Sequence, residues 1–338
     1  METTLIGGSE VARIGLGTWA MGGMEWGAVS DQEAVSTVLG ARECGINFID
    51  TAPIYGHGRS EEMVGQAMRA HGRRADFYIA TKAGLSWSSA GVFTDSTAAR
   101  LRDELEASLR RLNTDYIDLY QIHWPDPLVP IAETATLLNE FRREGKVRAL
   151  GVSNFSIAQM EEFRAVAPLA SNQLPYNLFE RQIESCADGG CAHSGSLLDW
   201  CREQKIAVLT YSSLCRSLLG GRVHRGMVFD AKDIRSVDPK FQEPRFSQYM
   251  SAVEALAALA KERFGKSVLE LAARWVLDRP GVCVALWGAK RPDQLDAVTG
   301  VMGWKLDGES MEEIDRIVEA AVKEPVGPEY LTPGIRGK

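Results

Sequence analysis

The stretch from Gly45 to Gly65 reads GINFIDTAPIYGHGRSEEMVG, and it contains a strand, a loop and the start of a helix. The apolar run that begins it is short enough for a buried strand and ends at Asp50. A loop rich in glycine follows, and from Ser60 onward the apolar residues recur at helical spacing. Asp50 and Tyr55 therefore lie at and just beyond the C-terminal end of a strand, where parallel α/β proteins place their reacting groups.

Two later stretches place further polar groups in the same way. DFYIAT at 76–81 predicts a strand that leads to Lys82, and YIDLYQI at 116–122 predicts one that leads to His123. We therefore expect Asp50, Tyr55, Lys82 and His123 to lie at one common rim, formed by the C-terminal ends of these strands. In this order they resemble the catalytic tetrad of the aldo-keto reductases.

The resemblance extends over nearly the whole chain. Further family motifs are matched by Gly17-Thr18, by Gly151-Val152-Ser153-Asn154-Phe155, by Gln173, by Tyr211-Ser212 and by Gly288-Ala289. Within the family, Leu214 to Arg216 and Leu286-Trp287-Gly288 look like a bacterial group that acts on polyols and small aldehydes, the glycerol dehydrogenase-like members.

Strands and helices alternate regularly, which predicts parallel strands joined by right-handed crossovers. The predicted strands are 13–17, 46–50, 76–81, 116–122, 147–152, 170–174, 206–211 and 282–287. The predicted helices are 31–43, 60–71, 96–112, 132–144, 156–166, 195–203, 247–263, 267–278, 292–301 and 309–322. We expect residues 1–338 to form a single (β/α)8 TIM barrel domain with an N-terminal hairpin in 1–12. The helices that begin at 247 and 309 match two that the family adds to its barrel.

Composition and charge exclude several classes of protein. The net charge of −7 and the lack of a basic run argue against nucleic acid as a partner. No apolar stretch reaches the roughly 18 residues of a membrane span, and the N-terminus lacks a signal-peptide pattern, so we expect a cytoplasmic protein. Six cysteines without regular spacing indicate reduced thiols.

One short region contains several possible metal ligands, namely Cys186, Cys191, His193 and Cys201. Their spacing does not match a zinc motif, because the first two cysteines are separated by four residues and His193 follows Cys191 too closely. We interpret the region as a loop insertion and predict no metal.

The four rim residues suit carbonyl reduction, which needs a proton donor beside a hydride source. We expect Lys82 to lower the pKa of Tyr55, the acid or base, and Asp50 to keep Lys82 charged. His123 either hydrogen-bonds the substrate oxygen or shares the proton. Each residue alone has an ordinary structural interpretation, but convergence of four at matching strand ends favours a functional site.

The resemblance implies a nicotinamide cofactor and the residues that hold it. Ser153, Asn154 and Gln173 would bind the carboxamide, with Tyr211 stacked on the ring, and Ser212, Leu214, Arg216 and Leu218 would follow the pyrophosphate. Gly288, Ala289, Lys290, Arg291 and Gln294 would hold the adenosine end, and Thr18 and Trp19 complete the predicted set. Ser153 and Asn154 could equally cap the helix at 156–166.

Lys290 and Arg291 at a helix N-terminus form an anion site that favours a 2′-phosphate, and hence NADP (NADPH). Two positions depart from the family pattern: Ser213, where a proline is common, and Val298, where many relatives have an asparagine.

Tryptophans in the predicted rim loops are candidates for the wall of a substrate pocket. These are Trp19, Trp26, Trp87, Trp124 and Trp287. The sequence thus predicts an NADP-dependent oxidoreductase that interconverts a small-molecule carbonyl, in an aldehyde, ketone or sugar, and its alcohol. A dehydrogenase of aldoses or ring hydroxyls stays open, as does an NADP-binding regulatory subunit without turnover, like the potassium-channel β-subunits. The oligomeric state is left open.

Overall fold

Eight parallel strands form a closed barrel in the computed structural model, which describes residues 1–89, 91–185 and 195–337. In spatial order the strands are β3 (Ile14–Gly17), β4 (Phe48–Asp50), β5 (Tyr78–Ala83), β8 (Ile117–Ile122), β9 (Val147–Ser153), β10 (Ser171–Pro175), β11 (Ala207–Tyr211) and β12 (Val282–Gly288). β12 pairs with β3 and so closes the barrel. The predicted (β/α)8 TIM barrel is confirmed.

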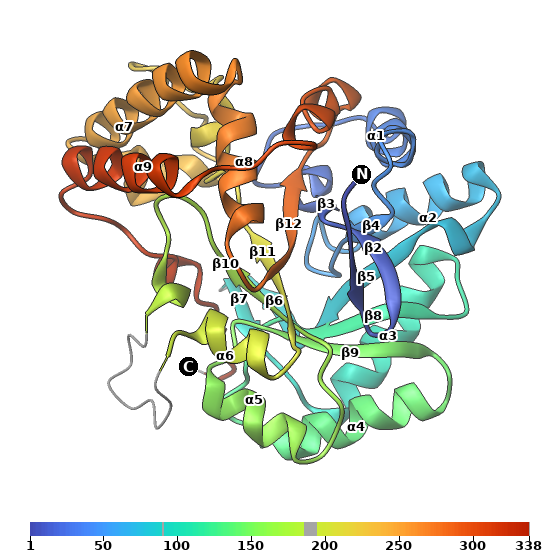
Figure 1. The fold of residues 1–338 in the computed structure, drawn as a ribbon. Helices are drawn as coiled ribbons and strands as arrows, with labels where there is room; N and C mark the ends of the chain where they lie inside the picture. Colours follow the sequence, from blue (N-terminus) through green and yellow to red (C-terminus); the bar gives the residue numbers. More distant parts are fainter. Residues whose placement is uncertain (90, 186–194, 338) are drawn as a thin grey trace.

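Helices surround the barrel (Figure 1). Those of the βα units are α1 (Asp31–Glu43), α2 (Arg59–His71), α3 (Ala98–Leu112), α4 (Ile131–Arg143), α5 (Ile157–Arg164), α6 (Leu197–Glu203) and α8 (Val268–Asp278). The two added helices, α7 (Arg245–Leu259) and α9 (Gly308–Ala321), pack side by side. The cap of α5 is Ser156, whose side chain accepts the amide hydrogen of Gln159. The alternative of Ser153 and Asn154 as ordinary caps for this helix is therefore wrong.

The barrel interior is filled by apolar side chains and closed at its N-terminal end. Phe48, Leu119 and Leu209 belong to this inner cluster, together with Ile6 and Val11 from the hairpin. The hairpin consists of β1 (Thr3–Ile6) and β2 (Ser9–Ala12) in antiparallel register. Since the hairpin covers the N-terminal end, the C-terminal end is the one left for chemistry.

A cavity of about 690 Å³ lies beside the hairpin at the N-terminal ends of β9 to β12. Its lining includes Gly7, Arg148, Arg202 and Lys205, and none of the predicted site residues. The cavity therefore lies away from the candidate site.

The structure differs from the predicted elements in two places. Instead of one helix at 292–301 there are two short 3-10 turns, η8 (Pro292–Leu295) and η9 (Thr299–Val301). A small sheet outside the barrel, formed by β6 (Leu85–Ser88), β7 (Gly91–Thr94) and β13 (Gly334–Ile335), was not predicted. Among the described residues, no helix combines the length and apolar character that crossing a bilayer requires.

Candidate active site

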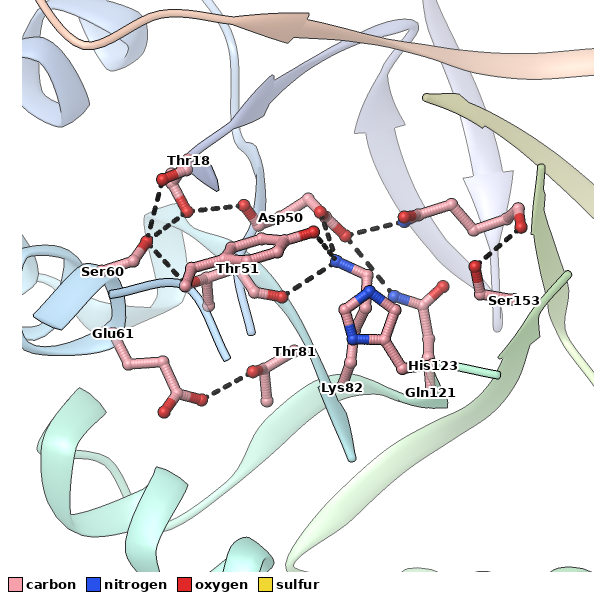
Figure 2. Close-up of polar contacts among 12 residues, drawn as sticks. Thr18, Asp50, Thr51, Ser60, Glu61, Thr81, Lys82, Gln121, His123 and Ser153 are labelled. Carbon is pink, nitrogen blue, oxygen red and sulfur yellow. Dashed lines mark hydrogen bonds and ion pairs between the residues drawn. The ribbon is translucent and has the colours of Figure 1, made fainter. Parts of the chain in front are cut away.

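The four predicted catalytic residues lie together at the C-terminal ends of β4, β5 and β8, and Figure 2 labels three of them, Asp50, Lys82 and His123. The ammonium of Lys82 donates to Asp50 Oδ1 at 2.6 Å and to the Tyr55 hydroxyl at 3.1 Å. It also donates to the carbonyl oxygen of Thr51 at 3.0 Å. The rings of Tyr55 and His123 lie edge to face with centroids 5.9 Å apart. One lysine thus joins the carboxylate to the phenol.

The loop that carries Tyr55 is held in place at both ends. Thr18 Oγ1 donates to the carbonyl oxygen of Asp50, and Ser60 Oγ lies 2.7 Å from Thr18 Oγ1. Gly56, next to Tyr55, has φ 61°, and a Cβ there would lie 2.4 Å from the carbonyl oxygen of Gly22. Glycine at this position therefore lets two loops touch. Thr18 thus anchors the backbone of Asp50, and its contact with the cofactor stays a prediction.

The ion pair between Lys82 and Asp50 is buried, with side chains 0% and 2% exposed. Burial acts to lower the pKa of Lys82, but the charge of Asp50 and the hydrogen bonds to Asp50 and to the Tyr55 oxygen outweigh burial and raise the pKa above its ordinary value. Lys82 is consequently an ammonium at neutral pH. Its three acceptors match the three protons of that group.

The pKa of Tyr55 moves opposite to the direction expected from the sequence. Burial raises the pKa of the phenol above its ordinary value, and the ammonium of Lys82 offsets only part of this. The sequence pointed to the lysine but could not show that the phenol is also partly withdrawn from water. At neutral pH Tyr55 is therefore a protonated donor.

His123 is neutral at physiological pH. Burial, and secondarily the charge of Lys82, hold the pKa of the imidazole well below its ordinary value. A neutral imidazole can donate one hydrogen bond to a carbonyl oxygen without supplying a charge.

Asp50 receives two further hydrogen bonds from amide side chains. Gln173 Nε2 donates to Asp50 Oδ2 at 2.7 Å, and Gln121 Nε2 approaches the same oxygen at 3.5 Å. Gln173 was predicted to bind the carboxamide, and here it orients the carboxylate. Gln121 was not predicted, although a buried glutamine in an apolar strand just before His123 was a usable signal.

The other residues assigned to the carboxamide form one hydrogen-bonded group at the rim. Asn154 Nδ2 donates to the carbonyl oxygen of His123 at 3.1 Å, and Asn154 Oδ1 accepts from the Tyr211 hydroxyl at 2.9 Å. Ser153 Oγ donates to the carbonyl oxygen of Gln173 at 2.9 Å. These contacts place a ring and an amide beside His123, an arrangement that fits a nicotinamide.

The segment after β11 has an unusual backbone. Ser212, Cys215, Arg216 and Ser217 all have φ between 47° and 69°. Left-handed backbone at non-glycine residues is costly and is often found at ligand sites. Leu214, which is partly buried, and Leu218, which is buried, pack into the core from this segment.

Arg216 in this segment is buried and incompletely paired. Its Nη1 donates to Asp238 Oδ2 at 2.5 Å, but its Nε and Nη2 are buried without a hydrogen-bond partner among the described residues. Unpaired guanidinium donors suit an anion such as a pyrophosphate. The residues present therefore fit the dinucleotide that the resemblance implies.

The residues predicted for the adenosine end cluster after β12. Gln294 Oε1 accepts the amide hydrogens of Lys290 at 2.8 Å and Arg291 at 3.1 Å. The Lys290 ammonium is hydrogen-bonded to the carbonyl oxygen of Trp26. Gly288 is exposed and Ala289 is buried. The side chain of Arg291 reaches Asp293, which leaves it near the surface.

Of the five tryptophans predicted to wall the pocket, one contacts a tetrad residue directly and a second contacts the first. Trp19 stacks on Tyr55 with centroids 6.1 Å apart, and Trp26 meets Trp19 edge to face. Trp87 stacks on His57 at 4.5 Å, and Trp124 is partly exposed directly after His123.

Trp287, also predicted to wall the pocket, is 3% exposed and belongs to the outer core cluster between barrel and helices. Its indole donates to the carbonyl oxygen of Gln294. This position argues against a place for Trp287 in the pocket wall, because alternate residues of β12 face opposite sides of the barrel wall.

Of the four possible metal ligands in the sequence, only Cys201 belongs to the described residues. Cys201 belongs to α6 and is buried in the core. Cys186, Cys191 and His193 lie outside the described residues.

Comparison with known proteins gives the family. The sequence model of the aldo/keto reductase family matches residues 13–319, and the chain belongs to that family of oxidoreductases. It is 50% identical to the aldo-keto reductase YhdN of Bacillus subtilis over 99% of each chain. It is 35% identical to the NADH-specific methylglyoxal reductase of Escherichia coli, over 84% of this chain and 88% of that protein.

Comparison with solved structures agrees with this family. The glycerol dehydrogenase AKR11B4 from Gluconobacter oxydans superposes with a TM-score of 0.85 at 46% identity, covering 96% of this chain and 98% of that one. An aldo/keto reductase from Klebsiella pneumoniae in complex with NADP and acetate superposes with a TM-score of 0.71 at 29% identity, covering 96% and 97%.

Proposed function

We propose that the protein is an NADP-dependent oxidoreductase that interconverts a small-molecule carbonyl, in an aldehyde, ketone or sugar, with its alcohol, using Tyr55 as acid and base. The observation that carries the proposal is the Tyr55 hydroxyl, protonated at neutral pH and held 3.1 Å from the Lys82 ammonium. A proton donor of this kind completes the reduction of a carbonyl.

Each residue of the tetrad has a distinct part. Tyr55 gives its proton to the developing alkoxide, and Lys82 stabilises the phenolate that remains. Asp50, oriented by Gln173, fixes the ammonium. Neutral His123 donates a hydrogen bond to the substrate oxygen. A bound nicotinamide cofactor supplies the hydride in reduction and takes it up in oxidation.

NADP rather than NAD is supported by the cations near η8. Arg291 and Lys290 precede this turn, and Arg222 contacts Asp293 within it at 3.3 Å. A guanidinium can bind a 2′-phosphate through two parallel hydrogen bonds. Neutral or weakly polar substrates are supported by the tryptophans around Tyr55.

The test is turnover by the purified protein with NADPH and with NADH, on a panel of aldehydes, ketones and sugars, followed by absorbance of the reduced cofactor. We expect NADPH oxidation with at least one carbonyl, and weaker activity with NADH. Tight NADPH binding without turnover on a broad panel would instead support the regulatory subunit.

A further inference from the structure

A carboxylate that none of the predictions assigned lies beside the tetrad. Glu25 belongs to the loop between η1 (Trp19–Gly22) and α1 and is partly buried. Its Oε2 accepts the indole hydrogen of Trp19 at 3.0 Å. The Trp19 ring in turn faces the Tyr55 ring, with an interplanar angle of 25°. The Glu25 carboxylate is thus one aromatic ring away from the proton donor.

Among the residues that the structure describes, none forms an ion pair with the Glu25 carboxylate. Within the described part of the chain, its hydrogen-bond partner is the neutral indole of Trp19. Arg216 influences Glu25 from the loop after β11 and pairs with Asp238 through Nη1, but within the described residues no hydrogen bond or ion pair joins Arg216 to Glu25. His57, from the loop before α2, also faces Glu25, and its ring is stacked on Trp87.

The field of this carboxylate reaches the reacting groups. Glu25 contributes to the raised pKa of Tyr55, so its charge acts at the phenol. Burial raises the pKa of Glu25 itself, while the hydrogen bond from Trp19 opposes this rise. A donor such as the indole N–H favours the ionised carboxylate.

We propose that Glu25 makes the pocket selective for neutral, hydroxylated carbonyl compounds and their alcohols, and against carbonyl compounds that carry a carboxylate or a phosphate. This inference rests on the proposed function and names its substrate class. An anion in the pocket meets a like charge in a partly desolvated setting, which costs binding energy. A substrate hydroxyl instead finds an acceptor oxygen.

Two aldehydes of the same length separate charge from size: 4-carboxybenzaldehyde and 4-(hydroxymethyl)benzaldehyde. We expect the protein to prefer the neutral aldehyde in kcat/KM. In Glu25→Gln this preference should fall by about tenfold or more, the effect of one like charge nearby in a medium of intermediate dielectric constant. The change should come from a higher kcat/KM with the anionic aldehyde. The geometry around Trp19 should be kept, because the glutamine oxygen still accepts the indole hydrogen.

Glu43→Gln is the matched control, because it removes the same charge from an exposed position of α1. It should leave the preference unchanged. The two aldehydes are also titrated calorimetrically into NADP⁺-saturated protein that carries Tyr55→Phe, in both the parent and the Glu25→Gln background, so that the alcohol group of the neutral probe is not oxidised during the titration. Failure of the protein to reduce either aldehyde would count against the proposed function, while the binding ratio would still test Glu25. The inference would be overturned if the ratio of the dissociation constants for the two aldehydes were the same with Glu25 as with Glu25→Gln.

Discussion

Lys82 is the residue on which the site depends, since it is a fully buried ammonium that contacts both Asp50 and Tyr55. A buried charge is tolerated when its partner and its hydrogen bonds are complete. The sequence identified both partners from their positions at strand ends. It did not reveal that Gln121 and Gln173 support the carboxylate: Gln121 could have been noticed as a glutamine in an apolar strand, but its partner and that of Gln173 lie on strands far apart in the chain.

Asp50→Asn should destabilise the fold, since it leaves the Lys82 ammonium without its carboxylate. We expect the free energy of unfolding to fall by about 3 kcal/mol, the usual cost of breaking a buried ion pair from one side. Urea denaturation of the parent, Asp50→Asn and the exposed control Glu43→Gln gives the comparison. A loss in Asp50→Asn no larger than in the control would mean that Lys82 does not depend on this partner.

The pKa directions predict how the two reaction directions respond to pH. Because the pKa of Tyr55 is raised, the proton needed for reduction is present across the neutral range and is lost only in strong alkali. Because the pKa of His123 is lowered, it does not titrate near pH 7. The kcat for reduction should therefore be flat from about pH 6 to 9, while kcat for oxidation rises with pH as the phenolate fraction grows.

Stopped-flow measurement of the hydride-transfer step in both directions, in buffers of constant ionic strength, would check this expectation. A reductive step that titrates near pH 7 would contradict the protonation states assigned to Tyr55 and His123.

At the scale of elements, the barrel strands and most helices were predictable because each has a clear apolar period and a cap or glycine at its end. The helix expected at 292–301 was wrong: the turn that begins at Pro292 ends after four residues, and a second turn follows. The β6–β7–β13 sheet was missed because β13 lies some 240 residues from its partner β7, and local patterns carry no information at that separation.

The C-terminal segment should protect β7. Gly334 and Ile335 pair with Phe93 and Thr94, and Arg336 forms an ion pair with Asp95. Deletion of residues 333–338 removes the pairing partner, so we expect amide hydrogens in 91–95 to exchange about tenfold faster or more. Amides of β5 serve as the internal control and should be unchanged. Unaltered exchange in 91–95 would mean that the pairing contributes nothing in solution.

At the scale of the whole molecule, a buried ionic cluster connects parts of the chain that no local pattern predicts to be in contact. Asp238 contacts Arg216 and Lys240, and it accepts a hydrogen bond from Tyr330 near the C-terminus. Lys240 also pairs with Glu180 at 2.8 Å. The cluster ties the left-handed segment after β11 to the C-terminal region, so the predicted pyrophosphate site is held by long-range contacts.

Cofactor preference is a property of the whole molecule, because the cations near η8 come from separate segments: Lys290 and Arg291 precede the turn, and Arg222 follows β11. Arg291→Ala should weaken NADPH binding by about tenfold, the order expected for one lost charge-assisted contact, and should leave NADH binding unchanged. Arg110→Ala, on the exposed face of α3, is the matched control. Fluorescence titration with both cofactors gives the result. Equal losses for NADPH and NADH would place Arg291 away from the 2′-phosphate.

The central claim is that Tyr55 is the proton donor, and single-turnover kinetics of Tyr55→Phe with NADPH tests it most directly. The phenylalanine ring keeps the packing against Trp19 and His123 but lacks the hydroxyl that contacts Lys82. We predict that the rate of carbonyl reduction falls by ~10² or more, as for loss of a general acid, while the dissociation constant for NADPH stays within about twofold. Reduction at the parent rate would contradict the account.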